Sequence, residues 1–74
     1  MLEVEKVLER LILMGVCDDY DEQIIRDIVT SIMQGPGLSS PLALRNFISK
    51  YYKIVDQGLA NIIYDQINKA TLND

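Results

Sequence analysis

Apolar residues recur at intervals of three and four along four stretches of the chain, and polar residues fill the positions between them. This spacing aligns apolar side chains along one side of an α-helix. It predicts four helices, at about 2–14, 20–34, 41–54 and 57–70. No stretch alternates polar and apolar residues for long enough to indicate a strand. We therefore expect an all-α fold, a small compact bundle of four short helices in a single domain, 1–74.

The apolar positions of each predicted helix share one side, and we expect these sides to pack together as the core. Leu2, Ile12 and Leu13 widen the stripe of the first helix beyond one side. The predicted core side chains are Val4, Val7, Leu8, Leu11, Met14, Ile24, Ile25, Ile28, Val29, Ile32, Met33, Leu44, Phe47, Ile48, Tyr51, Val55, Leu59, Ile62, Ile63, Ile67 and Ala70.

Residues that favour helix ends stand at the predicted boundaries. Gly15 suits the left-handed conformation that often terminates a helix. Asp19 is the predicted cap of the second helix, with Glu22 completing a capping box. Proline within the Gln34-Gly35-Pro36-Gly37 segment ends that helix, and Ser40-Pro41 begins the third.

Residues 41–70 allow either one helix or two. A single helix would carry Gly58 in its interior, at a cost of about 1 kcal/mol relative to alanine. A continuous rod of about thirty residues could not fold back to cover its own apolar face. We therefore expect a break, with Asp56 as the cap of the last helix.

Length and composition favour association with another chain. A domain of 74 residues buries only about 60% of the surface that its unfolded chain exposes. Cys17 is the single cysteine and histidine is missing, so neither an internal disulfide nor a standard structural zinc site can compensate. The hydrophobic fraction of 49% is high for so small an interior. We expect an interface with another protein, with a second copy, or with both.

The net charge of −4 opposes binding to phosphate backbones and to anionic membrane surfaces. The longest apolar run, residues 11–17, is much shorter than the roughly 20 residues of a membrane span. Charged residues near the N-terminus interrupt any signal peptide. With a free thiol as well, we expect a cytoplasmic protein without membrane contact.

The chain lacks the usual equipment of an enzyme. Nucleophilic catalysis by Cys17 or by a serine requires a base, usually histidine, and there is none. No Ser-x-x-Lys motif and no glycine-rich phosphate loop is present. Acidic neighbours raise the pKa of the Cys17 thiol, which makes it unreactive. We expect no catalysis, no cofactor and no metal.

Four carboxylates, Asp18, Asp19, Asp21 and Glu22, lie within five residues. Their spacing does not fit a calcium-binding EF-hand loop. Acids stabilise a helix N-terminus, so capping is the favoured interpretation of this cluster. An acidic docking patch is the alternative.

One stretch mixes basic and aromatic residues, which are favoured in protein interfaces. One of its two adjacent tyrosines can point inward and the other should lie at the rim. The predicted docking face consists of Arg45, Lys50, Tyr51, Tyr52 and Lys53, together with Tyr64.

Taken together, these features predict a non-enzymatic protein–protein interaction module that acts through a helical surface. An adaptor, a small inhibitor or immunity-type protein, and an assembly domain all fit. The alternative is a helix-turn-helix-like DNA-binding regulator that reads DNA with residues 41–53. That motif usually has a shorter turn than Gln34 to Ser40 and a more basic recognition helix.

Overall fold

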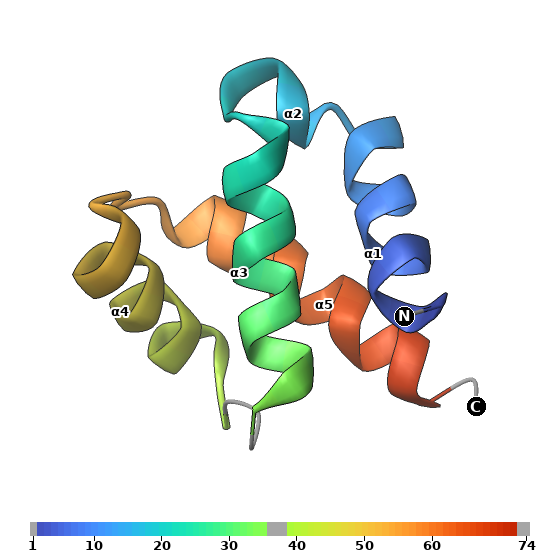
Figure 1. Cartoon of the computed structure of the whole chain (residues 1–74). Helices are drawn as coiled ribbons and strands as arrows, with labels where there is room; N and C mark the ends of the chain where they lie inside the picture. Colours follow the sequence, from blue (N-terminus) through green and yellow to red (C-terminus); the bar gives the residue numbers. More distant parts are fainter. Residues whose placement is uncertain (1, 36–38, 73–74) are drawn as a thin grey trace.

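Helices account for all the regular structure in the computed structural model, which describes the backbone of residues 2–35 and 39–72 and the side chains of 3–35 and 39–70. The prediction of an all-α bundle is confirmed. The helices are α1 (Leu2–Leu13), α2 (Val16–Asp19), α3 (Glu22–Gln34), α4 (Pro41–Tyr52) and α5 (Gln57–Leu72) (Figure 1).

α5 is the element that the other long helices share. It packs against α4, α1 and α3, and α1 also packs against α3. Figure 1 shows α1 and α4 on opposite sides of α3, with α5 crossing behind them. The surfaces of α1 and α4 that face away from α3 are therefore separate faces of the molecule.

The core draws side chains from every helix, and its members come largely from the predicted apolar stripes. The buried hydrophobic residues are Val4, Val7, Leu8, Leu11, Val16, Ile25, Ile28, Val29, Ile32, Leu44, Ile48, Leu59, Ala60, Ile63 and Ala70. Removal of this apolar surface from water is the main force that stabilises such a fold. The described residues leave no buried polar side-chain atom without a hydrogen-bond partner, although Gln66 is buried among them.

Three predicted core residues are exposed instead. Met14 is 52% exposed, Tyr51 61% and Val55 68%. Met14 follows the last residue of α1, Tyr51 occupies the last turn of α4, and Val55 belongs to the connection after it. Helical spacing gives the direction in which a side chain points, but a neighbouring element must be present to cover it. At these helix ends no described element covers the side chains, so the predictions for these residues were wrong.

A single helical turn, α2, lies between the first two predicted helices. Gly15 precedes it with a φ of 87°, in the left-handed region, and so ends α1 as predicted. Val16 is buried and anchors the turn to the core. Tyr20 then adopts an extended conformation, which separates α2 from α3.

The predicted cap of the second helix was wrong, because Asp19 is the last residue of α2. The cap of α3 is Asp21, whose carboxylate accepts a hydrogen bond from the Gln23 backbone N–H at 2.8 Å. The chain must turn at Tyr20 before α3 can begin, so the cap lies two residues later than predicted. α3 ends at Gln34 as predicted, whereas Pro36 and Gly37 lie outside the described residues.

The predicted break between residues 41 and 70 is confirmed. The Ser40 hydroxyl accepts a hydrogen bond from the Ala43 N–H at 3.1 Å and caps α4. α4 ends at Tyr52, two residues earlier than predicted, because Lys53 takes a left-handed conformation with a φ of 62°. Asp56 then accepts a hydrogen bond from the Leu59 N–H at 3.0 Å at the start of α5.

Two leucines of α4 provide a matched test of the core. Leu44 is 0% exposed and Leu42 is 57% exposed. We expect Leu44→Ala to lower the free energy of unfolding by about 2–5 kcal/mol, because it removes buried methyl groups and leaves a cavity. Leu42→Ala should change it by less than about 0.5 kcal/mol. Urea unfolding followed by circular dichroism measures both, and equal losses would contradict this assignment of the core.

Candidate functional site

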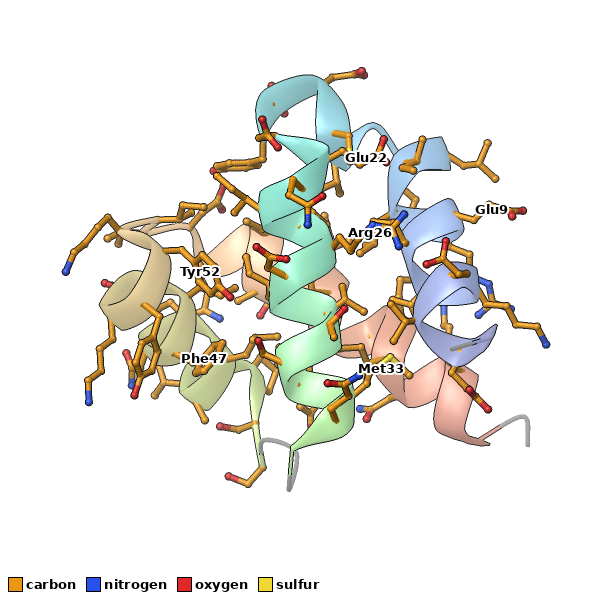
Figure 2. The ribbon with its side chains drawn as sticks, viewed as in Figure 1. Glu9, Glu22, Arg26, Met33, Phe47 and Tyr52 are labelled. Carbon is orange, nitrogen blue, oxygen red and sulfur yellow. The ribbon has the colours of Figure 1, made fainter. Side chains whose placement is uncertain are left out.

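The aromatic residues of the predicted docking face have different environments. Tyr51 is 61% exposed, whereas Tyr52 is half-buried against the core. Phe47 lies between them, with its ring centroid 5.0 Å from that of Tyr51 and 6.2 Å from that of Tyr52. Figure 2 shows Phe47 and Tyr52 on the side of α4 that faces α3. One tyrosine thus points inward and the other lies at the rim, but the inward one is Tyr52 and not Tyr51, which the apolar stripe had placed in the core.

The cations of this face gather at the C-terminal end of α4. The Lys50 Nζ atom lies 5.3 Å from the centroid of the Tyr51 ring, within the range of a cation–π contact. The Lys53 ammonium donates to the Lys50 carbonyl at 3.4 Å. Arg45 is half-buried more than one helical turn earlier and donates to Asn46 Oδ1 at 3.4 Å. We call Lys50, Tyr51, Lys53 and the exposed Val55 the basic patch.

Tyr64 does not join the basic patch. Its hydroxyl donates to the Ser39 carbonyl at 3.3 Å, which ties α5 to the start of α4. Its ring is half-buried against the core. Since α4 has 12 residues, its two ends are about 18 Å apart. The role of Tyr64 here is to hold the two helices together.

The four clustered acids occupy α2 and the start of α3. Asp21 caps α3, which agrees with the favoured interpretation, whereas Asp18, Asp19 and Glu22 are exposed. Among the described residues, no three metal-ligating side chains lie close enough together to hold an ion. Burial raises the pKa of the Cys17 thiol, and the negative charges of Glu22, Asp18 and Asp21 raise it further.

Three consecutive apolar residues, at and just after the end of α1, are exposed, and no site was predicted for them from the sequence. Ile12 is 41% exposed, Leu13 79% and Met14 52%. We call these three residues the apolar corner. The sequence contained a signal for it, because Ile12 and Leu13 lie outside the regular stripe of the first helix and the run 11–17 is the longest apolar run in the chain.

A solvent-open hollow of about 280 Å³ adjoins the apolar corner between α1 and α3. Its lining residues are Glu5, Leu8, Glu9, Ile12, Leu13 and Arg26. The Arg26 guanidinium forms an ion pair with Glu5, and this hydrogen bond lowers the pKa of the Glu5 carboxyl. Figure 2 shows Arg26 reaching from α3 toward α1 and Glu9 on the outer side of α1. Arg26 is paired with Glu5, and no described residue forms an ion pair with Glu9.

A second open hollow, of about 250 Å³, is lined by Met14 of the corner and by residues of α2 and of the start of α5. In it the Tyr20 hydroxyl donates to Asp56 Oδ2 at 2.7 Å, which joins the α2–α3 connection to the start of α5. This bond lowers the pKa of Asp56, as does the bond from the Leu59 N–H. It also raises the pKa of Tyr20.

The pKa shifts make this tyrosine–aspartate pair poorly suited to acid–base chemistry. A general acid or base works best when its pKa lies near the working pH. The pKa of Asp56 is moved down and that of Tyr20 is moved up, so both groups are moved away from neutrality. The hydrogen bond is better explained as a tie between two segments of the chain.

Of the described helices, none combines the length and apolar character that crossing a membrane requires. Comparison of the chain with protein-family models, with curated proteins and with solved structures gives no match.

Tyr20→Phe tests this tie through its pH dependence. The hydrogen bond lowers the pKa of Asp56 in the folded chain, so it stabilises the fold when the pH is above the pKa of Asp56 in the unfolded chain. This stabilisation is lost in acid, below about pH 4, as the carboxylate of the folded chain is protonated. The pKa of Tyr20 is raised in the folded chain, so the stability that its hydroxyl contributes is lost as the pH rises above about 10 and the hydroxyl ionises. We expect Tyr20→Phe to have a lower urea midpoint than wild type at neutral pH. The difference between the two midpoints should shrink at acidic and at strongly alkaline pH.

Tyr51→Phe is the matched control, because the Tyr51 ring is exposed. The same urea titrations over a series of pH values should leave its midpoint close to that of wild type. A Tyr20→Phe difference that stays constant with pH, or an equal loss in Tyr51→Phe, would contradict the tie.

Proposed function

We propose that this chain is a non-enzymatic protein-binding module that acts through its helical surface. The observation that carries the proposal is the apolar corner. Single exposed apolar residues are ordinary on a protein surface. Three in succession beside an open hollow are typical of an interaction site.

The apolar corner is available for binding because the fold does not use it. Leu8 and Leu11 of the same helix are already buried in the core. Full burial of a leucine or methionine side chain contributes about 1.5–3 kcal/mol. Leu13, at 79% exposed, therefore keeps most of its apolar surface for a partner.

The basic patch supports the same function. Tyrosine and arginine dominate the energetics of protein interfaces, and aromatic residues there are favoured over charged ones. The exposed Tyr51 ring is held between Phe47 and Lys50, so little of its freedom is lost on binding. An adaptor, a small inhibitor or immunity-type protein, and an assembly domain would each use such surfaces. The free Cys17 thiol supports a reducing, cytoplasmic setting for this binding module.

DNA binding through residues 41–53 is the alternative that we consider less well supported. The segment contains three cations and no acid. However, α4 packs mainly on α5, and Leu42 is exposed on it. Three phosphate contacts would also give weak binding at physiological salt. We expect a gel-shift assay at low salt to show no duplex binding; a salt-sensitive shift that is lost in Lys50→Glu would favour the regulator instead.

Leu13→Ser tests the protein-binding function, with Leu42→Ser as its control. Both leucines are exposed, and only Leu13 belongs to the apolar corner. We expect a pull-down from the native cell, quantified by mass spectrometry, to lose its specific partners with Leu13→Ser and to retain them with Leu42→Ser. Identical capture by both variants would contradict a role for the corner.

A further inference from the structure

The apolar corner and the basic patch lie in regions of opposite charge. Residues 9–22, which contain the corner, include five acids and one base, Arg10, for a net charge of −4. Residues 30–55, which contain the basic patch, include three bases and no acid, for a net charge of +3. The next acid along the chain, Asp56, is held by Tyr20 and by the N-terminus of α5.

Each surface combines exposed apolar side chains with an excess of one sign of charge, although Arg26, paired with Glu5, also lines the hollow at the corner. At the corner, Glu9 lines the hollow beside Leu13, and Asp19 lines the second hollow beside Met14. At the basic patch, Lys50 and Lys53 flank Tyr51. Together the two surfaces contain five of the six exposed large hydrophobic side chains among the described residues, with Leu42 as the sixth.

The two surfaces lie at the ends of two different helices. The corner belongs to the end of α1 and the basic patch to the end of α4, and α3 stands between these helices (Figure 1). Complementary surfaces at two helix ends can meet between molecules. Complementary charge steers such an encounter and disfavours partners of like charge.

We propose that the chain binds a second copy of itself, with the apolar corner of one molecule receiving the basic patch of the next. This inference rests on the proposed protein-binding function and names the partner. Tyr51 and Val55 pack against Leu13 and Met14, while the lysines approach Glu9 and the acids of α2. The contact covers exposed large hydrophobic side chains of both surfaces.

Such a contact is head-to-tail. In a two-fold symmetric dimer the same patch serves both molecules, whereas here each contact uses two different patches. After one contact, one molecule keeps a free basic patch and the other keeps a free apolar corner, so chains or closed rings form as concentration rises. A small contact area gives weak, reversible association, and salt weakens it further because exposed charges are screened.

Two double variants, each lacking one surface, test the arrangement. Glu9→Lys with Leu13→Ser removes the corner, and Lys50→Glu with Tyr51→Ser removes the basic patch. All four side chains are exposed, so circular dichroism should remain that of wild type. If Tyr51→Ser lowers helicity through its contact with Phe47, Lys50→Glu alone replaces it. Glu3→Lys, at the other end of α1, is the control for the change in charge.

Sedimentation equilibrium should show that wild type and Glu3→Lys grow in mass from micromolar to millimolar concentration. Each double variant should associate at least about tenfold more weakly. Mixed in equal amounts, the two variants should form a 1:1 dimer and nothing larger, because one keeps its basic patch and the other its corner. Salt should dissociate that dimer.

A strictly monomeric wild type would overturn the proposal. So would a mixture of the two variants that forms no dimer, or a wild type that stops at a dimer which one double variant still forms. The protein-binding function is tested separately, by whether Leu13→Ser loses cellular partners other than this chain itself.

Discussion

α5 brings Leu59, Ala60 and Ile63 to the centre of the molecule, where the apolar sides of α1, α3 and α4 meet them. Helices of 12 to 16 residues are marginal in water by themselves, so each of these elements depends on that shared burial. A domain of this size has a single hydrophobic core. Every other feature, including the placement of the surface residues, follows from how the helices cover α5.

Hydrogen bonds at the connections fix how the helices enter and leave that core. Tyr20 and Asp56 join two segments that are 36 residues apart, and the same Asp56 caps α5. Tyr64 binds the Ser39 carbonyl just before α4. Each bond satisfies polar groups where the chain turns, and each sets the position of a helix end. Together these bonds position the α2–α3 connection and the starts of α4 and α5.

The exposed surface contains apolar side chains that the small core cannot accommodate. A chain that is 49% hydrophobic has more apolar side chains than its small interior can hold, and part of the excess gathers at the ends of α1 and α4. Three residues of the predicted docking face, Lys50, Tyr51 and Lys53, lie at the C-terminal end of α4. The sequence could not show that Tyr64 belongs to a different junction or that Ile12, Leu13 and Met14 lie together in the open. Those facts depend on which helix covers which neighbour.

The sequence by itself determined the helices, their apolar sides and most of their ends, because periodicity, capping residues and glycine act over a few neighbouring positions. Gly15, Ser40 and Asp56 each behave as local chemistry predicts. Only the tertiary structure decided that Tyr51 and Val55 are exposed and that Asp21, not Asp19, caps α3. Burial depends on a second element being present, and the cap moved because the chain turns at Tyr20, whose side chain is held by a residue far along the chain. Contacts between residues far apart in the chain produce no periodic pattern in the sequence, so they cannot be predicted from it in this way.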